Sequence, residues 1–331
     1  MTRSAKSALV VAALWSVLGL ARAQSPQGFT YYSIGNPGDV QRVTSPGLVL
    51  MGGGTDVDAA FRWLMEKSGG GDVVVIRASG SDGYNPYIFE LGKVDSVESI
   101  IFETREAAYN PFIIGKIRNA EALWIAGGDQ GNYIKRWKGT PVEDAIHDLA
   151  RRKVPIGGTS AGLAVLGEFS FAALNDTITS AAALANPFDE NMTIERDFLR
   201  FPQLAGIITD SHFAARDRMG RSVAFLARIR QEGWSPDPRG IAIDERTALL
   251  VEEDGSTTVA GAGNIYFLRA TEAPRVCAPG KPLEIAGVSV QRLHAGDKFN
   301  LRAWSGSAGA AYSLSASAGK LSSTQPGGSA Y

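Results

Sequence analysis

The sequence predicts an α/β protein of three layers, in which a mostly parallel β-sheet lies between helices on both of its faces. Short, continuous apolar runs, which are typical of strands buried on both faces, alternate with segments whose apolar residues recur at helical spacing. A strand, a helix and a second strand follow one another within about thirty residues, as in a crossover unit that places its two strands parallel. Beyond about residue 275 the pattern changes to the alternation of a β-rich segment.

The first half of the chain repeats this strand and helix alternation. Strands are expected at 47–51, 72–79, 97–104, 122–128 and 154–160, and helices at 57–65, 110–120 and 141–153. In the first helix Val57, Phe61 and Leu64 share one face, and the glycines at 69–71 end it. Pro111 and Pro141 stand near the starts of the next two helices, where the missing N–H of proline costs no hydrogen bond.

The second half is expected to hold fewer helices. A strand and turn are expected at 205–213, a helix at 219–233 and antiparallel strands at 239–270 with a hairpin at Glu253–Ser256. We therefore predict a main α/β domain at 24–272 and a small β-rich segment with a Gly/Ser-rich tail at 273–331.

The first 23 residues have the pattern of a secretory signal peptide. Arg3 and Lys6 precede the apolar run Ala-Leu-Val-Val-Ala-Ala-Leu-Trp-Ser-Val-Leu-Gly-Leu, which ends at Ala-Arg-Ala before Gln24. The run is short for a membrane span, which needs about 20 apolar residues, so a retained anchor is the weaker alternative. We expect cleavage after Ala23, a secreted or periplasmic protein, and no membrane attachment after cleavage.

Composition excludes several other classes. The formal net charge of −1 gives no sign of a nucleic-acid partner. Cys277 is the only cysteine, so no internal disulfide can form, and its loop-like setting between prolines indicates an inert thiol. The sequence contains neither H-E-x-x-H nor a paired-cysteine ligand set, and we therefore expect no metal and no cofactor.

Residues 155–163, Pro-Ile-Gly-Gly-Thr-Ser-Ala-Gly-Leu, place Ser160 between glycines at minus two and plus two. This G-x-S-x-G pattern, after an expected strand and before an expected helix, is typical of a strained turn that exposes a nucleophilic serine. The alternatives are an ordinary glycine-rich connection and a nucleotide site. No lysine follows these glycines as a phosphate loop requires, and the glycines at 52–54 lack the third glycine of a dinucleotide fingerprint.

A serine nucleophile needs a general base, and the chain has three histidines. His147 lies four residues after Glu143 in an expected helix, which a solvated helix pair explains, and His294 lies on a turn of the β-rich segment. His212 follows a buried strand at its expected carboxyl end, where parallel sheets place chemistry. We therefore predict His212 as the base of Ser160; the alternative is a structural histidine with satisfied hydrogen bonds.

Three segments in this order resemble the cyanophycinase family of serine peptidases: Ile-Ala-Gly-Gly-Asp-Gln at 125–130, Gly-Gly-Thr-Ser-Ala-Gly at 157–162, and residues 210–221. The likeness spans about residues 45–270, and the exported subgroup is the most similar. The family is akin to the aspartyl dipeptidases and shares the class I glutamine-amidotransferase fold. Cyanophycinases cut cyanophycin, a polyaspartate backbone with arginine on each β-carboxyl, into β-Asp-Arg dipeptides. The resemblance implies an exported peptidase for this polymer or related β-aspartyl-arginine peptides, and a homodimer is compatible with it.

The resemblance also implies roles for individual residues. Ser160 would be the nucleophile and His212 its base, while backbone N–H groups of Gly128 and Ala161 would form the oxyanion hole. The residues implied to hold the substrate are Gln130, Asp210, Arg216, Arg218 and Arg221. Arginines suit the α-carboxylates of the polymer because a guanidinium donates two hydrogen bonds in a fork, and Asp210 or Asp129 would receive the arginine of the substrate. A solvated helix start is the alternative for the three arginines.

The third member of the triad is where this chain departs from the family pattern. The acid of the family lies between the nucleophile and the histidine, near position 182, where this chain has Ala182. Asp176 is the first substitute, and the further candidates are Glu168, Asp189 and Glu190. An unsupported imidazole costs about four orders of magnitude in turnover. An impaired homologue that binds peptides is therefore one alternative. An α/β-hydrolase-type esterase, which shares G-x-S-x-G but usually adds an HGGG-like loop and a late histidine, is another.

Overall fold

The structure is a computed structural model that describes residues 28–331. The expected signal peptide at 1–23 lies outside the described residues. Among the residues that are described, none of the helices has both the length and the apolar character needed to cross a bilayer.

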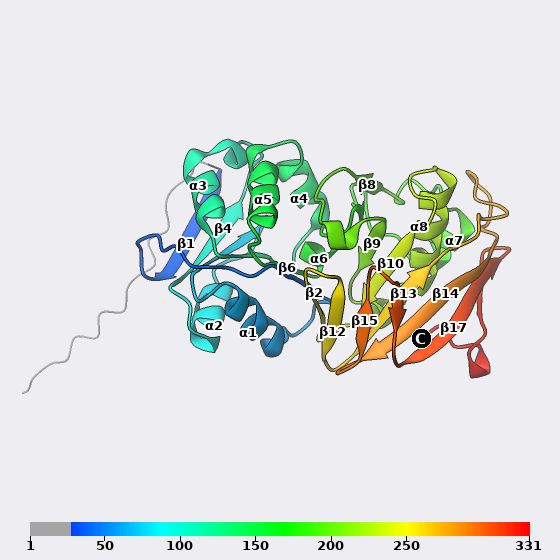
Figure 1. Cartoon of the computed structure of the whole chain (residues 1–331). Helices are drawn as coiled ribbons and strands as arrows, with labels where there is room; N and C mark the ends of the chain where they lie inside the picture. Colours follow the sequence, from blue (N-terminus) through cyan, green and yellow to red (C-terminus); the bar gives the residue numbers. More distant parts are fainter. Residues whose placement is uncertain (1–27) are drawn as a thin grey trace, which may run out of the picture.

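Two β-sheets lie side by side along the molecule (Figure 1). The first sheet has ten strands, in the order β1 (Phe29–Gly35), β4 (Ser96–Phe102), β3 (Asp72–Arg77), β5 (Ala122–Ile125), β6 (Ile156–Thr159), β2 (Leu48–Met51), β11 (Thr247–Val251), β12 (Ser256–Gly261), β15 (Lys298–Asn300) and β16 (Ser305–Gly306). The strands from β4 to β2 in this order are parallel, and the others pair antiparallel. The parallel centre brings the carboxyl ends of β2, β5 and β6 to one edge.

Helices cover both faces of this parallel centre. They are α1 (Asp58–Lys67) and α2 (Tyr84–Leu91) on one face and α3 (Pro111–Asn119), α4 (Gln130–Trp137) and α5 (Pro141–Arg151) on the other (Figure 1). Alternate residues of β3 show why: Val73 and Val75 pack in the core with α1, whereas Val74 and Ile76 pack in the core with α3 and α5. All four side chains are buried, as expected for a strand with an apolar layer on each side.

The second sheet has eight strands, in the order β18 (Lys320–Ser323), β17 (Ala310–Ser317), β14 (Ile285–His294), β13 (Asn264–Arg269), β10 (Arg239–Ile243), β9 (Ile207–Asp210), β7 (Phe169–Phe171) and β8 (Ile194–Arg196). Only β10, β9 and β7 are parallel neighbours. This half has two short helices, α6 (Ala161–Ala164) and α7 (Ser180–Ala185), and a longer one, α8 (Met219–Gln231). Both α7 and α8 pack on one face of the sheet.

The other face of the second sheet packs against the end of the first sheet. Phe267 of β13 stacks on Phe299 of β15 with ring centroids 3.8 Å apart, and Trp304 meets both rings edge-on. These side chains belong to the same core that α3 and α5 cover. The two sheets therefore share one continuous apolar interior.

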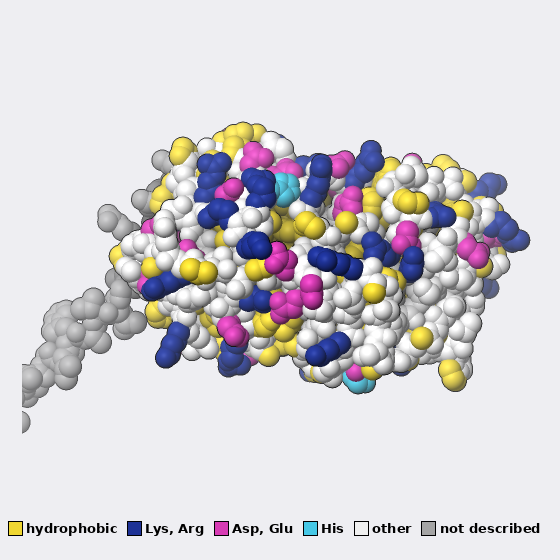
Figure 2. Space-filling view, viewed as in Figure 1, with side chains coloured by type: hydrophobic (Ala, Val, Ile, Leu, Met, Phe, Trp, Pro, Cys, Tyr) yellow, Lys and Arg dark blue, Asp and Glu magenta, His cyan; other side chains and the backbone are white. Residues whose placement is uncertain are grey.

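The expected α/β class with helices on both faces is confirmed, although the sheets are mixed, with antiparallel strands flanking the parallel ones. Residues 273–331 form β-structure, but not a separate appendage: β14, β17 and β18 extend the second sheet, and β15 and β16 extend the first. The alternation of this segment shows strands, but not which sheet each strand joins. Figure 2 shows Lys and Arg interspersed with Asp and Glu over the viewed face, in keeping with the near-neutral net charge.

Candidate active site

Ser160 lies directly after β6 at a sharp turn into α6. Its backbone has φ 53° and ψ −113°, a conformation that residues with a side chain rarely adopt. The flanking glycines make this turn feasible. A Cβ added to Gly158 would lie 2.7 Å from the backbone of Gly162, and one added to Gly162 would overlap the carbonyl of Ile125. The Ser160 side chain is half-buried, so its hydroxyl can be reached from outside.

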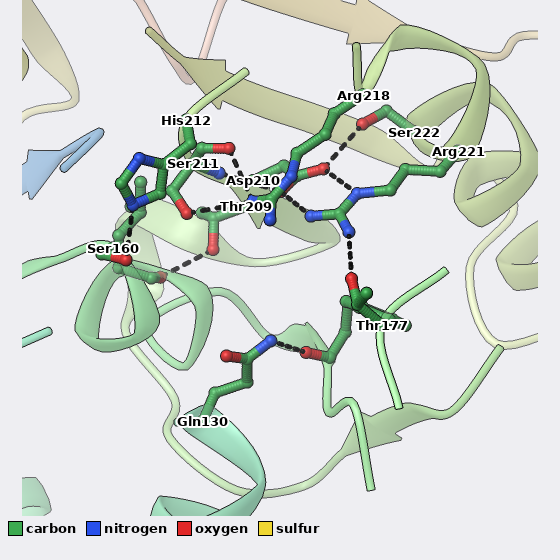
Figure 3. A network of polar contacts seen from close by, with 12 residues as sticks. Gln130, Ser160, Thr177, Thr209, Asp210, Ser211, His212, Arg218, Arg221 and Ser222 are labelled. Carbon is green, nitrogen blue, oxygen red and sulfur yellow. Dashed lines mark hydrogen bonds and ion pairs between the residues drawn. The ribbon is translucent and has the colours of Figure 1, made fainter. Parts of the chain in front are cut away.

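His212 follows β9 by two residues and lies next to this serine. Its Nε2 is 2.8 Å from the Oγ of Ser160 (Figure 3). His212 also has a positive φ of 45°, and its backbone N–H donates to the carbonyl of Gly52 at 2.8 Å. The histidine thus comes from the second sheet and the serine from the first, so the candidate site lies where the carboxyl edges of the two sheets meet.

Glu245 completes a hydrogen-bonded chain of three side chains. Its Oε1 lies 2.6 Å from Nδ1 of His212. Because β9 and β10 are parallel neighbours, the residues after their carboxyl ends lie close together, and Glu245 follows β10 as His212 follows β9. When Nδ1 of His212 carries the proton, its N–H donates to the carboxylate of Glu245. Nε2 is then unprotonated and can accept a hydrogen bond from the hydroxyl of Ser160.

The surroundings perturb the acid–base properties of this chain. Burial lowers the pKa of His212, the hydrogen bond to Glu245 acts in the opposite direction, and the cations of Arg216 and Arg218 add to the lowering. The net result is a pKa below the usual value, so the imidazole is neutral at neutral pH and can accept a proton. The hydrogen bond from His212 lowers the pKa of Glu245, which keeps that carboxylate ionised.

The glycines at 52–54 lie directly beside His212 and Glu245. Gly53 has φ 92°, and a Cβ added there would lie 2.5 Å from Cε1 of the His212 ring. One added to Gly54 would lie 3.1 Å from the Cβ of Glu245, and the N–H of Arg246 donates to the carbonyl of Gly53 at 2.8 Å. These glycines, which in the sequence resemble an incomplete nucleotide motif, let the backbone lie directly against the side chains of His212 and Glu245.

Asp210 and two of the three arginines form a buried ionic cluster. Arg221 donates from Nε to Oδ2 of Asp210 at 2.8 Å and from Nη2 to Oδ1 at 2.5 Å, and Arg218 donates to Oδ1 at 3.2 Å (Figure 3). The side chains of Asp210 and Arg221 are 7% and 3% exposed. Burial alone would raise the pKa of Asp210, but Arg221 and Arg218 hold it below the usual value.

This cluster corrects the substrate-binding role expected for Asp210 and Arg221. The polar atoms of both are already bound within the protein and have little contact with solvent. Arg218 is half-buried and also donates to the carbonyl of Ser211 at 2.8 Å. Arg216 differs, because it is exposed and forms no ion pair within residues 28–331.

The other expected site residues surround Ser160 less closely. Gln130, the first residue of α4, donates to the carbonyl of Phe171 at 3.3 Å, and Figure 3 shows its amide directed there. Gly128 is exposed in the turn after β5, and the neighbouring Gly127 lies beside Ser160, since a Cβ added to it would be 3.5 Å from that of Ser160. Ala161 is the first residue of α6, and the N–H at that position of a helix has no intrahelical acceptor.

The expected third acid was wrong. Asp176 is exposed and accepts a hydrogen bond from the backbone N–H of Thr177. Ala182 lies on α7 and packs against the apolar core of the second sheet. The further candidates Glu168, Asp189 and Glu190 do not contact His212 either; Glu168, for example, accepts from the N–H of Gly206. The sequence analysis did not predict Glu245, because it expected the acid between Ser160 and His212. His212 was predicted because it follows the carboxyl end of a strand, and the same reason applies to Ile-Asp-Glu at 243–245.

The remaining histidines and the cysteine lie elsewhere. His147 accepts from the N–H of Arg200, and His294 lies on an exposed turn with Asp297. Cys277 is buried, and burial raises the pKa of its thiol to about 11, so the thiol stays protonated at neutral pH. Residues 28–331 contain no cluster of three or more His, Cys, Asp or Glu side chains arranged to hold a metal ion.

The chain is similar to known peptidases. The family model described as peptidase family S51 matches residues 89–259, more than half of the chain. The cyanophycinase of Trichormus variabilis is 28% identical over 219 residues, which are 65% of this chain and 68% of that protein. The cyanophycinase of Synechococcus elongatus is 26% identical over 273 residues, 77% of this chain and 80% of that protein.

Among solved structures, a peptidase from an acI-B1 actinobacterium shares the fold. It matches with a TM-score of 0.53 and 18% identity, over 78% of this chain and 98% of that one. The chain belongs to peptidase family S51, the family of the cyanophycinases, and is a serine-type peptidase.

Proposed function

We propose that this protein is an exported peptidase that hydrolyses cyanophycin or related β-aspartyl-arginine peptides to dipeptides through Ser160, His212 and Glu245. The observation that supports it most is the continuous chain of hydrogen bonds, 2.8 Å from Ser160 to His212 and 2.6 Å from His212 to Glu245. Such a chain of nucleophile, base and orienting acid is the arrangement that activates a serine hydroxyl.

In the first step the Oγ of Ser160 attacks the carbonyl carbon of the scissile amide. Nε2 of His212 takes the hydroxyl proton and then gives it to the nitrogen of the leaving amine, while an acyl ester forms on Ser160. Glu245 holds the proton on Nδ1 and stabilises the imidazolium. In the second step Nε2 takes a proton from water, the hydroxide attacks the ester, and the proton returns to Ser160 as the acid leaves.

The negative oxygen of the tetrahedral intermediate needs donors beside Ser160. The N–H groups of Gly128 and Ala161 come from the two turns that flank the serine, after β5 and β6. Two backbone donors fixed by neighbouring strands stabilise developing charge without rearrangement. We assign the oxyanion hole to these two groups.

Substrate recognition is proposed to rest on Arg216. The backbone N–H of Arg216 donates to the carbonyl of His212 at 3.1 Å, and the charge of Arg216 lowers the pKa of both His212 and Glu245. It is exposed, and it forms no ion pair within residues 28–331. A carboxylate of a β-aspartyl-arginine peptide can therefore bind it without displacing a protein partner. Asp210 and Arg221 act behind this surface by fixing the loop that carries His212.

The two alternative functions are less well supported. A binding module that has lost turnover would lack an acid on His212, whereas Glu245 makes that contact. An α/β-hydrolase-type esterase usually has an HGGG-like loop and a histidine late in the chain, whereas this sequence contains no HGGG and matches the model of a peptidase family.

Purified residues 24–331 incubated with purified cyanophycin should release β-Asp-Arg, measured by liquid chromatography and mass spectrometry. Ser160→Ala should release none, and Ser45→Ala, which changes an exposed serine, should match the unaltered protein. Release by Ser160→Ala would remove Ser160 from the mechanism, and no release by the unaltered protein would contradict the substrate. The mass of the protein recovered from the periplasm or medium tests export, because cleavage after Ala23 leaves Gln24 as its first residue.

A further inference from the structure

The loop that carries His212 is held in an unfavourable backbone conformation. His212 has φ 45° and Asp217, five residues later, has φ 47°. Residues with a side chain adopt such values only where the surrounding structure imposes them. The contacts at the start of the loop are clear, since His212 donates its N–H to Gly52 and Ala214 donates to Asp244 at 2.9 Å. At the end of the loop, the backbone of Asp217 is held by the carbonyl of Ala214 and the hydroxyl of Ser180, and its side chain is held by a further support.

Tyr331 provides that support. Its hydroxyl accepts a hydrogen bond from the N–H of Met219 and donates one to Oδ1 of Asp217, both at 2.9 Å. Its ring meets Phe213 at 5.8 Å and Tyr266 at 6.0 Å between centroids, in both cases edge-on. Phe213 directly follows His212, so one side chain contacts the loop at both ends.

Tyr331 is itself held by the second sheet. The hydroxyl of Tyr312 on β17 donates to the carbonyl of Ala330 at 2.8 Å, and Gln325 and Ser329 donate to the backbone oxygen of Tyr331 at 3.3 and 2.8 Å. Burial and the neighbouring carboxylate of Asp217 raise the pKa of Tyr331, so the hydroxyl keeps the proton that it donates. The side chain is thus a fixed support, because its own segment is bonded on several sides.

We propose that Tyr331 is a positioning residue for His212, which keeps the loop 212–219 in the conformation that places the imidazole on Ser160. This inference rests on the proposed triad. Tyr331 does not touch the reacting atoms, so its loss should lower the fraction of molecules in which the Ser160–His212 hydrogen bond is formed. The effect should fall on kcat and on the reactivity of Ser160, while KM changes little.

The test uses Tyr331→Phe, which keeps the ring and removes both hydroxyl hydrogen bonds, and Tyr331→Ala, which removes the ring as well. The control is Tyr109→Phe, which changes an exposed tyrosine outside the loop 212–219 and its contacts. Two readouts are measured: kcat and KM on cyanophycin, and the rate at which a fluorophosphonate labels Ser160, which needs no peptide substrate. Melting temperatures show whether each variant is folded.

For Tyr331→Phe we expect kcat and the labelling rate to fall together by about five- to thirtyfold, the factor that corresponds to one or two lost hydrogen bonds. KM should stay within about twofold, and Tyr331→Ala should lose more. Labelling and kcat equal to those of Tyr109→Phe in both folded variants would overturn the role of Tyr331 alone. Failure of the unaltered protein to be labelled would instead overturn the triad, and this inference with it. Labelling without turnover of cyanophycin would contradict only the proposed substrate.

Discussion

Replacement of Glu245 by glutamine tests the triad most directly. The amide has nearly the same shape as the carboxylate, so the contact with Nδ1 of His212, now 2.6 Å, can be kept. Glutamine can, however, turn its NH₂ group toward Nδ1. The imidazole proton then moves to Nε2, where it faces the hydroxyl of Ser160. In that tautomer His212 cannot accept the proton that the serine must lose.

The size of the effect follows from how exposed Glu245 is. For a buried triad acid, the corresponding amide substitution in a serine protease lowers kcat by about 10⁴. The side chain of Glu245 is 39% exposed, so water screens the charge and can partly replace it as an acceptor. We therefore expect kcat to fall by about 10³, equivalent to about 4 kcal/mol in the activation free energy.

The assay is the initial rate of dipeptide release at saturating and limiting cyanophycin. KM should be nearly unchanged, because the ground-state contacts with the substrate stay in place. Glu272→Gln, which removes a carboxylate from an exposed loop position, is the charge-matched control and should keep full activity. A folded Glu245→Gln protein with a kcat within tenfold of the unaltered protein would show that Glu245 does not orient the base.

Three further predictions concern the same region. Because the pKa of His212 is lowered, the acid limb of kcat/KM should have its midpoint below about pH 6.5, the usual value for histidine. Arg216→Ala removes a cation that lowers this pKa, so the limb should move to higher pH in a rate–pH profile; movement to lower pH would contradict the assignment. Gly53→Ala should displace the imidazole and reduce kcat about 100-fold or more, whereas Gly280→Ala, also at positive φ but with open space around it, should leave kcat unchanged. Asp210→Asn leaves two cations without their carboxylate and should lower the free energy of unfolding in urea by about 3–5 kcal/mol, against less than about 1 kcal/mol for Asp197→Asn, whose two ion pairs are exposed. Since the pKa of Asp210 is lowered on folding, its contribution should be present above the usual pKa and lost as the pH falls through the lowered one; equal stability of the two variants at neutral pH would refute this account.

Local patterns were enough to predict the centre of the fold. The apolar runs that became β2, β3, β4, β5 and β6, and the helical spacing of Val57, Phe61 and Leu64, depend on side chains near one another in sequence. The turn at Ser160 could likewise be expected from its two glycines. By contrast, β1 (Phe29–Gly35) was not predicted, because it is an edge strand with polar residues and no clear apolar alternation. The helix α2 was not predicted either, because Pro86 lies within it and proline is unfavourable inside a helix.

The features that the sequence did not predict depend on contacts between distant segments. The strands of 285–323 look alike in sequence, and only packing decides that β15 joins the first sheet and β14 the second. Glu245 is 85 residues beyond Ser160, and the sequence around it does not distinguish it from the neighbouring Asp244. In the structure Asp244 instead accepts hydrogen bonds from the N–H groups of Ala214 and Asn264. The choice between two adjacent carboxylates is made by backbone direction after β10. The pairing of Asp210 with Arg221 was similarly hidden, because a substrate site and a structural ion pair require the same residue types.

The strands from 285 to 323 complete both sheets, and this has a consequence for how the enzyme matures. Because a ribosome makes the chain from its N-terminus, the segments before residue 285 have open strand edges until these strands are synthesised. The outer edges of β12 and β13 can therefore be paired only after residues 285–300 have been made.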